Sequence, residues 1–303
     1  FYLYKLSYTI LQDHFWSFLV SLLMYSSPLL SYYGFNFIPN IPALGFTLIA
    51  TYYYYKYYTS SKVHFLILAT LLFAIGALLK ISSLFTFLAI NAVFFLQNIL
   101  WIKQKRKAIL MQLGSVVFVF VMVFSWYLFS KNYNVRNADG LFRQDIIPIW
   151  NLSPEHIQKI LDVVYTNTII YVLNPFALIV LAGLFATSIV LWRKTSTTLL
   201  LITSILFLGV VMFILLFFEA MDAHEYFLID ATVIIPAIIL TFLTTMKGWS
   251  LKVFNSIITK MLAFVLLGLS LNYSVVITRD HYNPKDKMVT DNIPLPKRVQ
   301  DYW

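Results

Sequence analysis

The composition of this 303-residue chain indicates an integral membrane protein: 60% of its residues are hydrophobic, 12% are charged, and its formal net charge is +9 at pH 7. Soluble globular domains carry about 25% charged residues, so this class is excluded. The apolar runs are continuous, which favours an all-α bundle of transmembrane helices over a barrel of alternating strands. Most lysines and arginines lie in short loops between these runs, which is typical of topology signals, so nucleic acid is not an expected partner. The absence of cysteine excludes disulfides, thiolate metal ligands and a thiol nucleophile.

The apolar runs predict nine membrane-spanning helices, because each approaches the ~20 residues that cross a bilayer. A mixed aromatic segment, 1–14, comes first, as a surface loop or interfacial helix. The predicted spans are 15–33, 41–58, 63–79, 82–101, 108–130, 168–192, 198–218, 227–246 and 255–277. Residues 1–277 are therefore predicted to form one transmembrane domain, and 278–303 a periplasmic tail that could lead into a further domain. Because the chain starts at Phe1 without a methionine or signal peptide, we expect the true N-terminal part to precede it.

Basic loops predict the orientation of these spans. Lysine and arginine gather at 103–107, 193–194, 247–252 and 56–62. Nine spans place these four loops on one face, which the positive-inside rule makes cytoplasmic. The opposite face, periplasmic in a bacterial inner membrane, then receives 34–40, Lys80, 131–167, 219–226 and the tail.

The long external loop 131–167 is predicted to carry an amphipathic helix over 154–166. Ser153 can cap this helix, with Pro154 at its first position and Glu155 in its first turn. Its apolar residues recur at helical spacing on one face: Ile157, Ile160, Leu161 and Val164. The helix is expected either on the outer membrane surface or packed against other loop residues.

The stretch 219–230 places four acids and a histidine between two apolar runs, at one membrane surface. Ionisable groups at that depth are costly unless they are paired, hydrated or bound to a cation. His224, between Asp222 and Glu225, could bind a divalent metal ion of unknown identity or act in acid–base chemistry. The alternative interpretation is a short acidic hairpin loop in water.

Three further polar residues fall on the same external face. Lys80 lies at the turn of an apolar hairpin, where its ammonium could bind a phosphate at headgroup level or extend into water as a snorkelling lysine. Asn40 lies in the turn Pro39–Pro42, and taken alone it indicates a turn more than a ligand. Asp230 lies inside a span and needs a partner, and a spacing of four would put Tyr226 and Asp230 on one helical face.

Three motifs resemble, in order and on the expected face, the C superfamily of polytopic membrane glycosyltransferases. These are relatives of the lipid A aminoarabinose transferase and the protein O-mannosyltransferases. The first motif is Ser27-Pro28 with Tyr33-Gly34 and Pro39-Asn40-Ile41-Pro42-Ala43-Leu44, similar to an external loop of that family. The second is Gly76-Ala77-Leu78-Leu79-Lys80-Ile81-Ser82, and the third is His224-Glu225-Tyr226-Phe227, similar to a His-Asp-Tyr-Tyr motif.

This resemblance implies sugar transfer at the periplasmic face from a polyprenyl-phosphate-linked donor to a lipid, glycan or protein acceptor. It implies a donor-phosphate site at Lys80 and a possible metal at His224. The residues expected to line the site are Asn40, Asp222, His224, Glu225 and Tyr226. In that family the leading catalytic acid lies in the first external loop, which is expected before Phe1, and an Asp often replaces Asn40.

Three other functions compete with a glycosyltransferase. An O-antigen polymerase or ligase would carry several arginines in a long outer loop, and 131–167 has Arg136 and Arg143. A lipid-linked sugar flippase or transporter would show repeats and charges inside its spans. A non-catalytic membrane subunit would need no catalytic acid. Motifs for nucleotide binding, zinc proteases and serine hydrolases are absent from the sequence.

Overall fold

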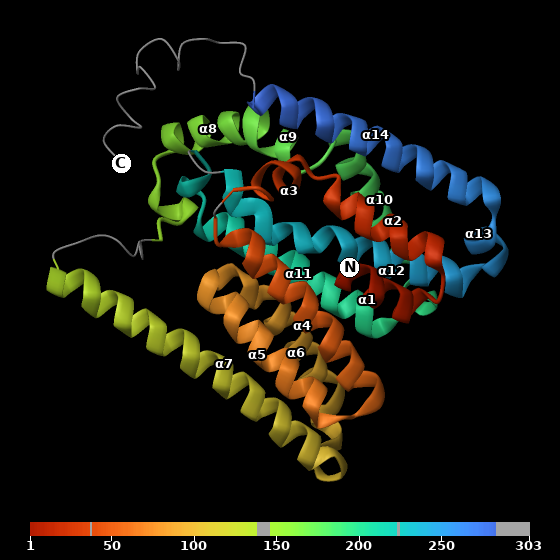
Figure 1. Cartoon of the computed structure of the whole chain (residues 1–303), viewed down its shortest axis with the longest axis horizontal. Helices are drawn as coiled ribbons and strands as arrows, with labels where there is room; N and C mark the ends of the chain where they lie inside the picture. The colour runs from red at the N-terminus through yellow and green to blue at the C-terminus, as the bar shows by residue number, and fades with distance from the viewer. Residues whose placement is uncertain (37, 138–145, 223–224, 283–303) are drawn as a thin grey trace.

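The structure, a computed structural model, describes residues 1–36, 38–137, 146–222 and 225–282, and over these residues it contains helices and no strands (Figure 1). The α-helices are α1 (Tyr2–Leu11), α2 (His14–Tyr25), α3 (Pro28–Tyr33), α4 (Asn40–Ser60), α5 (Val63–Leu79), α6 (Leu84–Asn98), α7 (Ile102–Asn137), α8 (Pro154–Val163), α9 (Ile169–Val172), α10 (Pro175–Val190), α11 (Thr197–Leu216), α12 (Ile234–Trp249), α13 (Leu251–Asn255) and α14 (Ile257–Tyr282). Two short 3-10 helices matter for the site, η1 (Ile81–Ser83) and η7 (Glu225–Val233).

Among the described residues, five helical segments are long and apolar enough to cross a membrane, so the chain has the architecture of a multi-pass membrane protein. They are Ile81–Trp101, Lys103–Asn137, Thr197–Leu216, Glu225–Trp249 and Ile257–Arg279. A sixth is obtained if the bent pair Pro154–Val172 and Pro175–Val190 counts as one span. The predicted all-α class is confirmed, but the predicted count of nine spans is not.

Breaks in the helices explain part of this difference. The run predicted as 15–33 is divided into α2 and α3, because Pro28 lacks an N–H and begins a new helix. The run 63–79 forms a helix of only 17 residues. The run 168–192 bends by 80° where Asn174 accepts a hydrogen bond from the Phe176 N–H and Pro175 begins α10.

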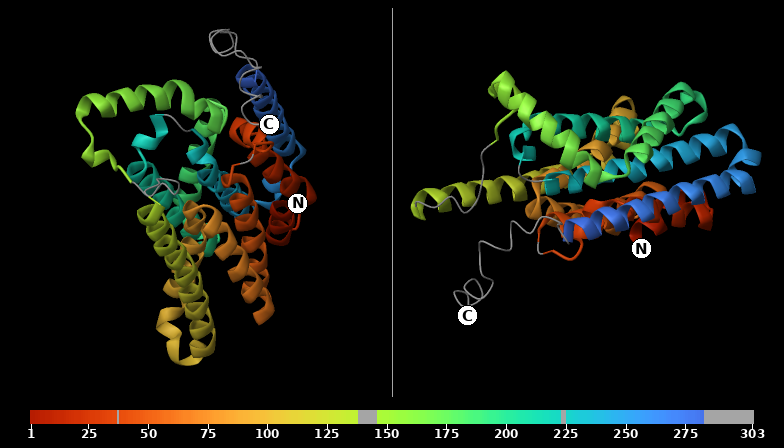
Figure 2. Two further views of the ribbon diagram at one scale, coloured as in Figure 1. Left: turned by 60° about the vertical axis from the view of Figure 1, so that its left-hand side comes forward. Right: turned by 90° about the horizontal axis from the view of Figure 1, so that it is seen from above.

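Helix α12 forms the centre of the bundle, and α7 lies along its outside (Figures 1 and 2). The span that contains α12 is 72% buried, against 22% for the span that contains α7. The Thr241 hydroxyl on α12 bonds that of Thr203 on α11 at 2.8 Å, and Thr245 bonds Thr195 at 2.7 Å. Such hydroxyl pairs hold helices together where both surfaces are apolar.

The amphipathic helix predicted within 131–167 is confirmed in α8. Ser153 Oγ accepts the N–H of His156, Pro154 occupies the first turn, and Glu155 follows. Ile160 is fully buried in the main core, and Ile157 packs against the same core. Ile157, Ile160 and Val164 of the predicted face therefore anchor the segment to the bundle, whereas Leu161 is 44% exposed and α8 ends at Val163, short of the predicted end at 166.

The helix directions bring several predicted external segments to one end of the bundle. There α4, η1 and η7 begin and α5 ends. The opposite end holds the contact of Gln97 with Thr198, whose side chains are 2.9 Å apart, and that of Lys105 Nζ with Asn98 Oδ1, at 2.7 Å. We call the first end, defined by Asn40, Lys80 and η7, the polar end. Which side of the membrane it faces stays a prediction.

Candidate functional site

Asp230 forms the centre of the polar end. Its side chain is 4% exposed, and its Oδ2 accepts hydrogen bonds from Ser82 Oγ at 2.6 Å and from Asn40 Nδ2 at 3.1 Å. Its other oxygen, Oδ1, is buried and has no hydrogen-bond partner among the described residues. A buried carboxyl oxygen without a partner is costly, so it marks a place where a further group would be stabilising.

The backbone around Asp230 is a 3-10 helix, η7, nine residues long. Runs of this length are uncommon, and in them residues three apart share a face. The prediction that spacing of four puts Tyr226 and Asp230 on one face is therefore wrong. Phe227 and Asp230 are three apart, and both act on Lys80.

Lys80 ends α5 with an extended backbone, at φ −152° and ψ 119°. Its Nζ lies 4.1 Å from the centre of the Phe227 ring, a cation–π geometry. The ammonium is not hydrogen-bonded to Asp230, since Oδ2 is bonded by Ser82 and Asn40 and Oδ1 has no described partner. Burial lowers the pKa of Lys80, and the negative charge of Asp230 opposes that shift. Lys80 thus presents a half-buried cation beside the carboxyl group.

Asn40 connects two parts of the site. It is 1% exposed, begins α4, and its Nδ2 donates to Asp230 Oδ2 and, at 3.3 Å, to the backbone oxygen of Tyr226. The sequence indicated a turn more than a ligand at this position. The structure shows a buried amide that fixes the carboxyl group and the start of η7.

Tyr33 fixes Glu225 at the outer edge of the polar end. Its hydroxyl donates to Glu225 Oε1 at 2.6 Å, and its ring meets that of Tyr226 edge to face at 5.9 Å between centres. Burial first, and then the hydrogen bond to Glu225, raises the pKa of Tyr33. The phenol therefore stays protonated and acts as a donor to the carboxylate.

The predicted metal centre cannot be built from the described residues. His224 lies outside them, and nothing is described of the Asp222 side chain. Across the described residues, no group of three or more His, Cys, Asp or Glu side chains could hold a metal ion. The metal at His224 stays a prediction.

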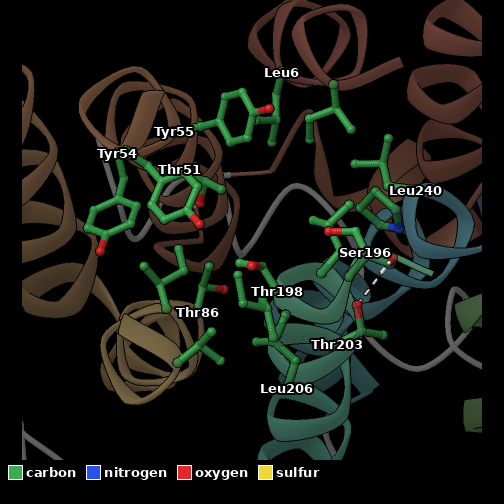
Figure 3. Close-up of a pocket in the computed structure, with 18 of the residues that line it drawn as sticks. Leu6, Thr51, Tyr54, Tyr55, Thr86, Ser196, Thr198, Thr203, Leu206 and Leu240 are labelled. Carbon is green, nitrogen blue, oxygen red and sulfur yellow. Dashed lines mark hydrogen bonds between the residues drawn. The ribbon is translucent and has the colours of Figure 1, made fainter. Parts of the chain in front are cut away.

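An internal cavity of about 380 Å³ begins close to the polar end (Figure 3). Val233 and Thr86 line it, one turn further along from Asp230 and Ser82. It extends between α1, α4, α6, α11 and α12 to Gln97 and Thr198 near the opposite end. Leucines, isoleucines and valines make up much of the wall, and threonine and tyrosine hydroxyls add polar atoms to it. A chain of mainly apolar character fits this lining.

The sequence located part of this site. It identified Lys80, Asn40, Glu225 and Tyr226, which the structure brings to one end of the bundle, and it expected a partner for Asp230. It missed three partners: Ser82, Tyr33 and Phe227. All three lie inside the motifs that carried the resemblance, so the signal was present, but hydroxyl and aromatic residues in an apolar run point to no particular role.

Comparisons with known proteins give no relative: no family model, no curated protein and no solved structure matches the chain.

Proposed function

We propose that this chain is a membrane glycosyltransferase that binds a polyprenyl-phosphate-linked sugar, with the donor phosphate at Lys80 and the isoprenoid chain in the internal cavity. The proposed localisation is a bacterial inner membrane, with the polar end facing the periplasm. The acceptor is a lipid, a glycan or a protein.

The observation that carries this proposal is the convergence of the three motifs at one end of the bundle. The first motif supplies Asn40, the second Lys80 and Ser82, and the third the start of η7, which leads to Asp230. Their contacts are hydrogen bonds and a cation–π contact between segments more than 140 residues apart. A half-buried ammonium at the polar end, together with a mainly apolar cavity whose lining begins one turn beyond Ser82 and Asp230, matches an anionic head joined to a hydrocarbon chain.

Lys80 would act on the leaving group in this reaction. In an inverting transfer the acceptor oxygen bonds to the anomeric carbon of the sugar, and the bond from that carbon to the phosphate oxygen breaks. The acceptor proton passes to a base, and the polyprenyl phosphate leaves with the bonding electron pair. A fixed ammonium stabilises the charge that develops on that phosphate. The resemblance implies that the base lies in the first external loop of the family.

A second candidate is a flippase for lipid-linked sugars. It is favoured by the buried Asp230 inside the span Glu225–Trp249, because ionisable residues in spans often mark transport pathways. It is also compatible with a cavity whose lining runs from Thr86 and Val233 to Gln97 and Thr198. A flippase moves the lipid between leaflets without consuming it, so the products separate the two functions.

Binding and turnover of the donor test the proposal. The protein in lipid nanodiscs should bind polyprenyl phosphate, and Lys80→Ala should weaken this binding at least tenfold. A hydrogen bond to a charged group contributes about 1.5–3 kcal/mol, and about 1.4 kcal/mol corresponds to a factor of ten in affinity. The matched control is Lys62→Ala, at the other end of α5, where the side chain is exposed.

Two results would contradict the proposal. One is equal affinity in the wild type and Lys80→Ala while Lys80→Ala keeps its melting midpoint. The other is transbilayer movement of a lipid-linked sugar without release of polyprenyl phosphate by the full-length protein, which would favour the flippase.

A further inference from the structure

Asp230 has no role in the reaction proposed above, although it is the most buried acid described at the polar end. It is also too enclosed to meet an acceptor, with 4% of its surface exposed. Two side chains from other helices hold its Oδ2, and both are themselves buried. An arrangement that fixes one carboxyl group this tightly raises the question of which group it acts on.

Two contacts place Lys80 close to Asp230: Ser82, which bonds Asp230, lies two residues after Lys80, and Phe227, whose ring Lys80 covers, lies three residues before Asp230. Within the described residues, Asp230 is the charge that opposes the effect of burial on this lysine. The other titratable groups on the neighbouring elements are engaged elsewhere: Glu225 accepts from Tyr33, and Tyr226 packs against the Tyr33 ring. On η1 and the first turn of α4 the sequence has no charged residue.

We propose that Asp230 is a positioning residue for Lys80: its carboxylate, fixed by Ser82 and Asn40, holds the half-buried ammonium directed at the donor phosphate without occupying its hydrogen bonds. This inference rests on the proposed phosphate site at Lys80.

The Asp230 carboxylate attracts the Lys80 ammonium without forming a hydrogen bond to it. Asp230 Oδ2 is taken by two neutral donors, and the ammonium lies over the Phe227 ring instead of against the carboxylate. The positive charge is thus compensated at longer range, and within the described part of the chain no side chain accepts a hydrogen bond from Lys80, so its N–H groups can bind an anion. A direct ion pair would use at least one of the three N–H donors of Lys80, whereas this arrangement uses none of them.

The test compares the pH dependence of polyprenyl phosphate binding in wild type and Asp230→Asn. The amide keeps an oxygen that can accept from Ser82 and Asn40 but removes the charge. The second pKa of a phosphate monoester is about 6, so from about pH 8 up to the ordinary lysine value of 10.5 the ligand is ionised and the loss of binding reports Lys80. Asp230→Asn should lose binding at lower pH than the wild type, with a melting midpoint near that of the wild type.

Repeating the comparison with Lys80→Arg separates this role from a structural one. Arginine stays charged over the whole pH range. In the Lys80→Arg protein, Asp230→Asn should therefore leave the pH dependence of polyprenyl phosphate binding unchanged. The inference would also be supported if Asp230→Asn lost binding at all pH values in the protein with Lys80 but kept binding in the Lys80→Arg protein. An unchanged profile in Asp230→Asn, or the same loss at every pH in both backgrounds, would overturn it.

Failure of this inference and failure of the proposed function can be distinguished. If Lys80→Ala binds polyprenyl phosphate as tightly as the wild type, the phosphate site itself is wrong. If Lys80→Ala abolishes binding but Asp230→Asn leaves the pH profile unchanged, the site stands and only the role of Asp230 is rejected.

Discussion

Ser82→Ala and Ser83→Ala form a matched pair of substitutions that measures how strongly the site holds Asp230. The two serines are neighbours in η1, with 3% and 5% of their surfaces exposed. Ser82 Oγ donates to Asp230 Oδ2 at 2.6 Å, whereas Ser83 Oγ is buried and has no hydrogen-bond partner among the described residues. The same atom is removed in both variants, so any difference reflects the bond to Asp230.

The expected difference follows from the cost of an unpaired buried group. Ser82→Ala leaves Asn40 as the described donor to the carboxyl group, and should lower the free energy of unfolding by about 1.5–3 kcal/mol if the carboxylate is charged. Hydrogen bonds between side chains in membrane proteins average about 0.6 kcal/mol, and this value is the smallest destabilisation expected for Ser82→Ala. Ser83→Ala removes a hydroxyl that has lost its hydration without gaining a partner, so it should be neutral or slightly stabilising.

Reversible unfolding by sodium dodecyl sulfate in mixed micelles, followed by tryptophan fluorescence, measures both variants. The cost of Ser82→Ala should also shrink when Asp230 is first replaced by alanine, because coupled residues are not additive. Equal costs for the two serine variants, or an undiminished cost of Ser82→Ala without Asp230, would refute the assigned hydrogen bond.

Three other predictions concern contacts that stabilise the bundle. Gly76→Leu should destabilise the fold by about 1–3 kcal/mol through overpacking, because a Cβ on Gly76 would lie 3.3 Å from the backbone oxygen of Ala43, while Gly45→Leu, with open space around it, should cost much less in the same unfolding assay. Ile160→Ala should lower the free energy of unfolding by about 2–5 kcal/mol and increase proteolysis of α8, and an unchanged digestion pattern would contradict its role as an anchor. The pKa of Asp13 is lowered: burial alone would raise it, but the Trp16 N–H and Lys260, at 2.9 Å, outweigh burial. The Asp13–Lys260 pair therefore stabilises the fold at pH values above 3.8, the ordinary pKa of an aspartate. This contribution is lost as the pH falls through the lower pKa of Asp13 in the folded state, so the melting midpoints of wild type and Asp13→Asn should converge in acid.

Local rules were sufficient to predict some elements from the sequence. The helix α8 was predicted from the Ser153 cap, Pro154 and the apolar spacing, since all of these act within a few residues. The Asn174–Pro175 pair carried an equally local signal for a break, which a search for long apolar runs overlooks. Length and hydropathy alone thus predicted more spans than the five, or six with the bent pair, that the described residues contain.

The details of the site depended on contacts that a single sequence does not display. Whether residues 225–233 form an α-helix or a 3-10 helix depends on packing, and this choice decides which residue faces Lys80. Likewise, Ser82 and Tyr33 gain their roles from partners about 150 and 190 residues away. The polar residues could therefore be named in advance, but their pairing could not.

Electron cryomicroscopy of the full-length protein with polyprenyl phosphate in a nanodisc would test the central claim most directly. The account predicts phosphate density at the polar end, within about 3 Å of Lys80 Nζ, and chain density in the cavity between α4, α6, α11 and α12. Phosphate density at the opposite end of the bundle, with Lys80 still over the Phe227 ring and the cavity empty, would contradict it.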